Sequence, residues 1–254
     1  MDILQRALAL PDLPKAQVTL CAVSSEAERA AAALRSLGIG TVEVSVCEKL
    51  AEPVASHADM LLRHVGGAVI FAAEPDAGYC RRLSELGFEL RGLGVELGSG
   101  YPADIALNTA CIGGLAMIGR RCPESALTRL LESSRRCVRV NQGYVKCSTA
   151  VISSSAAVTA DSGIAGALRQ NGLDVLEISP GGISIPCYDT GFIGGCCGLI
   201  APDVLAFCGR LSLLPDGRAV RDFAREHGVY IEELTGGTPE DIGGILPLME
   251  RVAA

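Results

Sequence analysis

The chain repeats one short unit of secondary structure five times, and this repetition limits its fold more than any other feature. Each copy is expected to hold two apolar strands, an amphipathic helix and a third strand, and a period of roughly 40–50 residues indicates a repeat architecture. The helices are expected at residues 24–37, 75–86, 123–136, 161–171 and 216–227. The strands after them are expected at residues 41–47, 88–92, 138–140, 173–179 and 229–234. Five copies in 254 residues leave no room for a further domain.

Glycines mark the ends of the expected helices. Four of the helices are followed at once by a glycine, the residue that adopts the left-handed conformation beyond a helix C-terminus at least cost. These glycines are Gly38, Gly87, Gly172 and Gly228.

A pair of strands is expected before each helix except the first. The pairs are residues 58–65 with 68–73, 103–112 with 115–120, 143–152 with 156–160, and 190–200 with 204–208. The first helix has only the strand at residues 17–23 before it, and residues 241–249 have strand character with no helix after them. We therefore expect the C-terminal strand to complete the N-terminal unit and close a ring, which removes exposed sheet edges. An open α/β sheet with six helices fits less well, because it does not explain the paired strands.

The ring hypothesis divides a single domain, residues 1–254, into five units. Their expected spans are 241–254 joined to 1–50, then 57–97, 102–141, 143–180 and 189–234.

Composition narrows the class of protein. Apolar residues make up 49% of the chain and charged residues only 20%, which is typical of a well-buried globular core. The net charge is −7, and no basic run is longer than an arginine pair, so nucleic acid is not expected as a ligand. No stretch approaches about 20 apolar residues, and the start lacks the order of a secretory signal, so we expect a cytoplasmic protein without a membrane span.

Cysteine is unusually frequent, with 11 residues. Most of them lie in apolar strands, for example Cys21, Cys111 and Cys208, where a free cysteine behaves as a small apolar side chain. The odd count in a chain of ordinary size favours reduced thiols over a disulfide framework.

Chemically competent residues gather at the starts of the expected first strands, which point toward the centre of the ring. They include a histidine, a cysteine and several carboxylates, and thus a candidate nucleophile, a proton-transfer group and anionic binding groups. These residues are His57, Asp59, Asp104, Cys147, Asp189, Glu240 and Asp241.

The five-fold repeat, with His57-x-Asp59 opening one strand and Gly143-x-Val145-x-Cys147 opening another, resembles the pentein fold. Within that fold it resembles the guanidino-group-modifying enzymes, namely arginine deiminases, dimethylarginine dimethylaminohydrolases and amidinotransferases. In that family the cysteine motif lies near the C-terminus, whereas here it precedes the segment from Asp189 to Phe192. The cyclic order of the motifs agrees if the chain is a circular permutation. The resemblance implies a five-bladed ββαβ propeller of the α/β class.

The resemblance also implies roles for the residues that match the family's motifs. Cys147 corresponds to the nucleophile that attacks the guanidinium carbon, and His57 to the general acid and base. Asp59 and Asp189 correspond to carboxylates that bind the planar cation through paired hydrogen bonds, and Asp104 is a further candidate. Glu240 or Asp241 would orient the histidine. The family has a glutamate three residues before this aspartate, and Thr238 occupies that position here, which puts the orienting role in doubt.

Elementary chemistry fits this interpretation. A cysteine is mostly a thiol at neutral pH and needs a nearby positive charge, from His57 or from the substrate, to ionise. Lys146 should lie on the opposite strand face and not assist. We therefore expect a hydrolase or amidinotransferase acting on a small cationic substrate, with no cofactor and no metal. The substrate, the choice between hydrolysis and transfer, and the oligomeric state are left open, and a homodimer is compatible with the sequence.

Three alternatives remain at this point. Cys196, in the segment Gly194–Gly198, is an alternative nucleophile. Together with Cys147, Cys187 and His57 it is also a candidate for a thiolate-rich metal site, although no Cys-x-x-Cys pair occurs. Finally, the protein is a candidate non-catalytic pentein that binds a small molecule, a metal or a partner, because fold alone does not define function.

Overall fold

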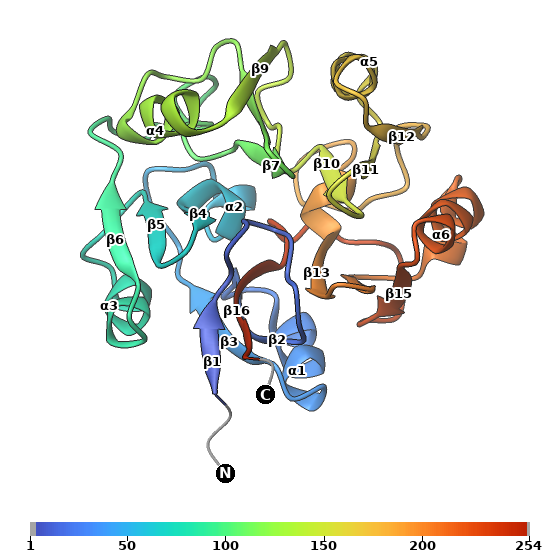
Figure 1. The fold of residues 1–254 in the computed structure, drawn as a ribbon, viewed down its shortest axis with the longest axis horizontal. Helices are drawn as coiled ribbons and strands as arrows, with labels where there is room; N and C mark the ends of the chain where they lie inside the picture. Colours follow the sequence, from blue (N-terminus) through green and yellow to red (C-terminus); the bar gives the residue numbers. More distant parts are fainter. Residues whose placement is uncertain (1–3, 253–254) are drawn as a thin grey trace.

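The computed structural model of the chain describes residues 4–252. Within these residues the strands form one sheet of four strands and four sheets of three strands. Figure 1 shows the sheets following one another around a common centre in chain order, with the longer helices on the outside. The five-unit α/β arrangement predicted from the repeat is confirmed.

Four of the units follow one path. The first strand runs antiparallel to the second, and a helix then leads to a third strand that runs parallel to the second. A parallel pair needs a crossover connection, and the helix supplies it. The elements are β4 (Leu62–Gly66), β5 (Val69–Ala72), α3 (Gly78–Glu85), β6 (Glu89–Gly92), β7 (Ala110–Ile112), β8 (Leu115–Gly119), α4 (Ala126–Ser134), β9 (Arg136–Val140), β10 (Thr149–Val151), β11 (Ala156–Thr159), α5 (Ser162–Gln170), β12 (Asp174–Glu177), β13 (Cys197–Ala201), β14 (Val204–Phe207), α6 (Gly217–Glu226) and β15 (Tyr230–Glu233).

The remaining unit joins the two ends of the chain. Its sheet has the order β1-β16-β2-β3, and α1 connects β2 to β3. The C-terminal strand β16 runs antiparallel to β2, as the sequence predicted, and β1 pairs on its other side. These elements are β1 (Gln5–Ala7), β2 (Val18–Ser24), α1 (Glu28–Ser36), β3 (Gly40–Val44) and β16 (Leu246–Arg251).

The helix predictions hold in detail. Each of the five expected spans contains an observed helix that is slightly shorter at its ends, among the residues the structure describes. The four glycines predicted to follow helices all have positive φ, between 73° and 94°. The hydrophobic periodicity and the terminating glycine together were sufficient to locate these helices.

The predicted starts of the first strands are wrong, and the error concerns the candidate site. We expected these strands from residues 58, 103, 143 and 190, but they begin at residues 62, 110, 149 and 197. The segments before them are loops, the short helix α2 (Ala58–Leu61) and the 3₁₀ helix η2 (Ile193–Cys196). Two further 3₁₀ helices are η1 (Glu52–Val54) and η3 (Leu211–Leu213). The apolar character of these segments reflects burial in turns rather than strand structure.

The N-terminal segment, residues 8–16, contacts the first strand of the neighbouring unit through a buried ion pair. Asp12 forms an ion pair of 2.6 Å with Arg63 of β4, and both side chains are buried. The carbonyl of Leu8 accepts a hydrogen bond from Gly67, and the Glu250 carboxylate accepts hydrogen bonds from the backbone N–H groups of Lys15 and Ala16. These contacts hold the segment to two of the five sheets.

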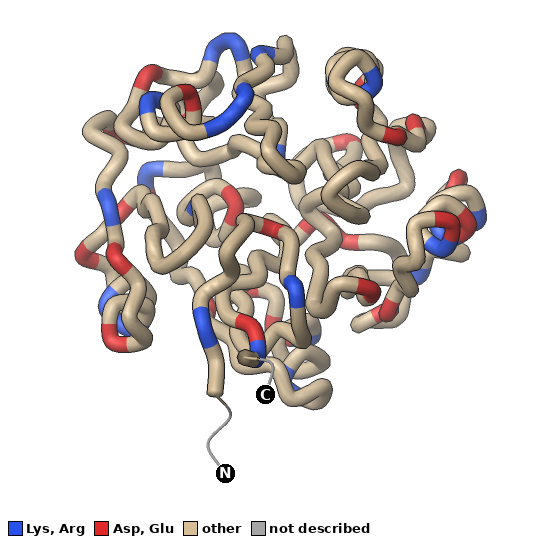
Figure 2. Tube along the Cα trace, viewed as in Figure 1, with Lys and Arg blue, Asp and Glu red and all other residues tan. Residues whose placement is uncertain are grey.

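Charged residues otherwise lie mainly on the outside. Figure 2 shows both signs of charge on the outer helices. No helix within residues 4–252 is long and apolar enough to cross a membrane. In the same part of the chain all eleven cysteines are free; Cys137 is half-buried, Cys187 is exposed and the others are buried.

Candidate active site

Cys147 lies in a turn that leads into β10. The turn is closed by hydrogen bonds from Ser148 N to Tyr144 O and from Thr149 N to Lys146 O. The Cys147 side chain is only 4% exposed, and its Sγ donates a hydrogen bond of 3.0 Å to Asp59 Oδ2. A buried thiol is therefore in direct contact with a carboxylate that comes from another unit of the fold.

Asn108 fixes the position of this thiol. Its side-chain oxygen accepts hydrogen bonds from the backbone N–H groups of Lys146 and Cys147, at 2.8 and 3.2 Å. Its Nδ2 then faces the sulfurs of Cys147 and Met60, at 2.9 and 3.2 Å. The two backbone donors fix which end of the amide carries the oxygen, so the N–H donor is aimed at the cysteine sulfur. Such a donor stabilises a thiolate.

His57 and Asp59 come from the start of the short helix α2. His57 occupies the N-cap position with extended backbone, and Asp59 lies in the first turn. The Asp59 side chain is 1% exposed, and its Oδ1 has no hydrogen-bond partner among residues 4–252. A buried carboxylate oxygen without a partner is costly, and a ligand with N–H donors would relieve that cost.

Asp241 approaches His57 from the C-terminal part of the chain. Its Oδ1 lies 3.8 Å from His57 Nδ1, beyond hydrogen-bond distance but close enough to stabilise the histidine whenever it carries a proton. Backbone N–H groups of Phe192 and Gly243 hold the carboxylate at 2.9 and 3.1 Å. Gly243 has φ of +75°, and a side chain there would collide with His57, so this position needs glycine.

The protonation states follow from burial and charge. Burial raises the pKa of the Cys147 thiol well above its usual range, and the carboxylates of Asp59 and Asp241 raise it further. Burial also raises the pKa of the Asp241 carboxyl, while His57 and the two backbone donors oppose that rise. In the structure, Cys147 is accordingly a thiol donor beside negative charge. A cation bound among these groups would lower the pKa of the thiol.

A cavity of about 150 Å³ opens in front of the thiol. His57, Cys147 and Asp241 supply its reactive side chains, and aromatic and aliphatic residues form the rest of its wall. The other lining residues are Val54, Met60, Tyr144, Ile185, Tyr188, Thr190 and Phe192. Residues from four different units thus meet at one cavity, as expected for the centre of the repeat.

The structure separates four of the predicted site residues from this cavity. Glu240 lies beside α1, where its carboxylate forms an ion pair of 2.8 Å with Arg29. Asp189 is exposed. Asp104 is buried, and its carboxylate accepts a hydrogen bond of 2.7 Å from the Tyr144 hydroxyl. Cys196 is fully buried and donates to the Phe192 carbonyl. Of the two acidic residues predicted near His57, Asp241 is the one that lies there.

The alternative thiolate-rich metal site is not assembled. Within residues 4–252, no group of three or more histidine, cysteine or acidic side chains is placed to hold a metal ion. The segment Gly194–Gly198 has a packing role instead. Gly195 N donates to Cys147 O, and side chains at Gly194 and Gly195 would collide with the Lys146 carbonyl and with Asp241.

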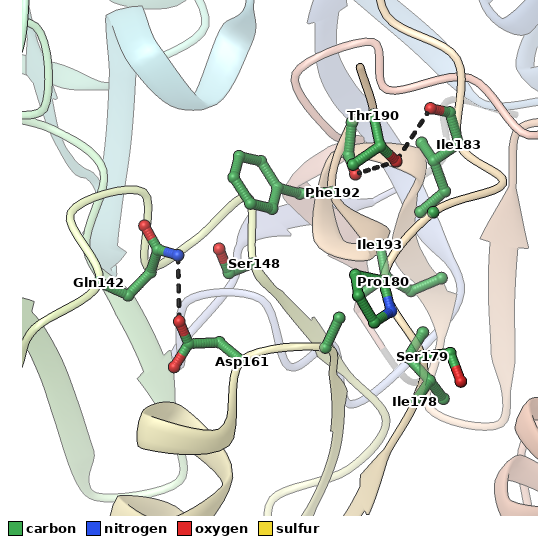
Figure 3. A pocket seen from close by; sticks show the side chains of 13 residues that line it. Gln142, Ser148, Asp161, Ile178, Ser179, Pro180, Ile183, Thr190, Phe192 and Ile193 are labelled. Carbon is green, nitrogen blue, oxygen red and sulfur yellow. Dashed lines mark hydrogen bonds between the residues drawn. The ribbon is translucent and has the colours of Figure 1, made fainter. Parts of the chain in front are cut away.

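A second cavity, of about 120 Å³, has Phe192 in its wall as well (Figure 3). Thr190 and Phe192 line both cavities. Gln142 and Asp161 form one wall through a hydrogen bond of 3.1 Å, and isoleucines form much of the opposite one. Ser148, the residue after Cys147, lines this second cavity, and its buried hydroxyl has no partner among residues 4–252.

Several solved structures with a similar fold are guanidino-modifying enzymes. Agmatine deiminase from C. jejuni matches with a TM-score of 0.56 and 9% identity, over 91% of this chain and 90% of that chain. The inosamine-phosphate amidinotransferase of Streptomyces griseus matches with a TM-score of 0.56 and 13% identity, over 98% of each chain. The dimethylarginine dimethylaminohydrolase of Pseudomonas aeruginosa, solved with citrulline, matches with a TM-score of 0.52 and 11% identity, over 93% of this chain and 100% of that chain. The chain therefore has the pentein fold of these enzymes.

Sequence comparison gives the family. Residues 22–246 match the profile described as "Family of unknown function (DUF6873)", and the chain belongs to this family. No curated protein matches the sequence. The matched span includes all the residues around the Cys147 cavity but not the N-terminal segment that carries Asp12.

Proposed function

We propose that the protein is a cysteine-dependent enzyme that acts on the guanidino or amidine-type carbon of a small cation through a covalent Cys147 intermediate. The observation that carries this proposal is the contact between the Cys147 thiol and the buried Asp59, directly beside a cavity that Cys147, His57 and Asp241 line. The fold shared with guanidino-modifying enzymes supports the same class of reaction.

The carboxylates select and position the cation. Asp59 has one oxygen engaged by the thiol and one buried oxygen without a partner. That free oxygen would accept an N–H group of a guanidinium that reaches past Cys147, and Asp241 presents a second negative charge to the cavity that Cys147 lines. Charge-assisted hydrogen bonds to a planar cation give both affinity and orientation.

Binding of the cation also activates the nucleophile. The positive charge lowers the raised pKa of Cys147, and the Nδ2 donor of Asn108 stabilises the sulfur anion. The thiol proton passes to His57, and the thiolate attacks the central carbon to form a C–S bond. His57 then gives the proton to the departing nitrogen, the C–N bond breaks, and a thiouronium remains on Cys147.

Water or an amine completes the reaction. In hydrolysis, His57 takes a proton from water, the oxygen attacks the thiouronium carbon, the C–S bond breaks, and the proton returns to sulfur. The net change converts a guanidine and water into a ureido compound and an amine or ammonia. In transfer, an amine takes the place of water and receives the amidino group.

Turnover assays test this proposal. The purified protein is incubated with arginine, agmatine, methylarginines and simple alkylguanidines, and ureido products and released amines are measured. We expect product from at least one guanidine and no detectable product with Cys147→Ala. Cys137→Ala is the matched control, because this half-buried thiol lies on β9, does not line the cavity, and its loss should leave turnover unchanged. Full turnover by folded Cys147→Ala would contradict the proposal.

A second candidate function is that of a non-catalytic cation-binding protein. It is favoured by the protonated state of Cys147, which acts as a hydrogen-bond donor and has a raised pKa. The two functions differ in outcome: a binding protein would bind guanidines and shield Cys147 from alkylation without forming any ureido or transferred product.

A further inference from the structure

The charges of the residues that line the Cys147 cavity limit which substrate chains can bind there. Among its lining residues, all of them in the described chain, there is no lysine and no arginine. The one charged group among them apart from the site histidine is the Asp241 carboxylate. A carboxylate on the substrate would therefore lose its water without gaining a cationic partner, and it would face a like charge.

Aromatic rings form a large part of the wall of the Cys147 cavity. The Tyr144 and Phe192 rings are stacked, with centroids 5.9 Å apart and an interplanar angle of 28°. Asp104 anchors the Tyr144 hydroxyl at 2.7 Å, and Tyr101 packs against the outer side of Tyr144. Flat or apolar groups pack well against such a rigid aromatic wall, because they bury area on the rings and have no polar atoms that need hydrogen-bond partners there.

Arg121 is the cation associated with this aromatic row, and its position explains why it does not serve the cavity. Its guanidinium lies over the Tyr101 ring, 5.9 Å from the centroid, and its side chain is exposed to solvent. Tyr101 thus neighbours both Arg121 and Tyr144, and Arg121 is not among the residues that line the cavity. An anion held by Arg121 would stay in water.

We propose, resting on the proposed function, that the substrate is a guanidine on an uncharged, apolar or aromatic chain without a carboxylate, and that Phe192 limits the size of this chain. Phe192 has this role because it lines both the Cys147 cavity and the second cavity of about 120 Å³, whose wall Figure 3 shows. Removal of the ring should therefore give the substrate chain access to the second space. The hydrogen bond from Phe192 N to Asp241 involves the backbone and survives the change.

Isosteric compounds test the charge of the chain. In 4-guanidinobutanoate the chain ends in a carboxylate, and in 4-methylpentylguanidine two methyl groups replace its oxygens. Binding is read as protection of Cys147 from alkylation by 2-chloroacetamidine, and turnover as kcat/KM. We expect 4-methylpentylguanidine to protect Cys147 at a roughly 100-fold or more lower concentration than 4-guanidinobutanoate, and to have a kcat/KM higher by the same factor. The reason is that the carboxylate loses its water in the cavity without gaining a partner. Arg121→Ala should leave this ratio unchanged.

Two outcomes overturn the inference in different ways. Equal or better use of 4-guanidinobutanoate would refute the chain preference while leaving the proposed reaction intact. Failure of every guanidine to bind or react would refute the proposed function, and this inference with it.

Variants of Phe192 test the size limit. Phe192→Ala should raise kcat/KM for 2-naphthylmethylguanidine relative to benzylguanidine by about tenfold, because the larger ring enters the second space. Phe192→Leu removes the aromatic ring but keeps part of its bulk, so the ratio should rise by about threefold, and this variant replaces the alanine variant if that fails to fold. An unchanged ratio in a folded Phe192→Ala protein, or in Phe192→Leu alone, would contradict the assigned role.

Discussion

At the scale of single residues, the position of the Cys147 thiol depends on the buried side-chain amide of Asn108. The sequence suggested Cys147, His57, Asp59 and Asp241, and these four surround or adjoin one cavity. Asn108 was missed, although an amide within the apolar run 105–112 is itself a signal, since a buried amide needs several partners. Its bonds to Cys147 depend on a turn that no spacing rule predicts.

Glu240 and Asp241 differ in a way that only the backbone path decides. Adjacent residues point in different directions, so one carboxylate faces His57 and the other faces Arg29 on the surface. Asp189 likewise matched a motif but lies exposed in a loop. Short motifs locate a segment of the chain, whereas the direction of each side chain depends on tertiary packing.

The neighbouring pair gives the first prediction. Asp241→Asn should lower kcat/KM by roughly 10²–10⁴-fold, because the carboxylate no longer stabilises protonated His57. Glu240→Gln should stay within about threefold of the wild type, because a surface ion pair contributes little. Steady-state kinetics on the best guanidine, with thermal melting to verify folding, provides the measurement. An equal loss in both variants would contradict the placement of Asp241 as the partner of His57.

At the scale of secondary-structure elements, helices and second and third strands were predictable and the connections into the centre were not. Periodicity locates α1, α3, α4, α5 and α6 because these helices bury one face against a sheet, and terminal glycines mark the ends of all of them except α4. The segments before the first strands are buried on all sides, so their composition resembles that of a strand whether they form a strand or a turn.

The β4–β5 hairpin contains a buried histidine that should make stability depend on pH. His64 Nε2 donates to the Gly67 carbonyl at 2.7 Å, and its Nδ1 is buried without a partner among residues 4–252. Burial lowers the pKa of His64 from 6.5 to about 4. As the pH falls, His64 therefore takes up a proton in the unfolded chain before it does so in the folded protein. This difference favours the unfolded chain, so stability is lost between about pH 6.5 and pH 4.

This gives the second prediction. Between pH 7 and pH 4.5 the wild type should lose about 2 kcal/mol more free energy of unfolding than His64→Gln, which keeps a donor for Gly67 but does not titrate. Urea denaturation at both pH values gives the change in free energy of unfolding between them for each protein. Because only these changes are compared, a difference in stability between the two proteins that is the same at both pH values does not affect the result. Parallel loss of stability in both proteins would show that His64 is not the titrating group.

At the scale of the whole molecule, the two ends of the chain complete one sheet. Residues in β1 lie opposite residues in β16, for example Gln5 opposite Arg251, so the two ends of the described chain lie on neighbouring strands. This closure was predictable because the first helix lacked a strand and the last strand lacked a helix. The N-terminal segment with the Asp12–Arg63 pair was not predictable, since it has no counterpart in the repeat.

The adjacent ends give the third prediction. A circular permutant with a short glycine linker between the natural termini, and new termini between Gly236 and Gly237, keeps every unit contiguous in sequence. We expect it to melt within a few degrees of the wild type and to retain turnover. A truncation that removes residues 246–254 should unfold, because β16 pairs with both β1 and β2. A folded, active truncation would show that this sheet does not require the C-terminal strand.

The central claim is that acidic groups draw a cation to a buried thiol, and alkylation of Cys147 tests it most directly. The reagents 2-chloroacetamidine and 2-chloroacetamide are nearly identical in shape, but only the first is a cation. Mass spectrometry follows modification of Cys147 over time in the wild type and in Asp59→Asn. We predict that the cationic reagent modifies wild-type Cys147 at least about tenfold faster than the neutral one.

Asp59→Asn should change the two rates in opposite directions. The cationic reagent slows because one attracting carboxylate is gone, whereas the neutral reagent accelerates because loss of that negative charge lowers the pKa of Cys147. Equal rates for the two reagents in the wild type, with no effect of Asp59→Asn on either, would contradict the account.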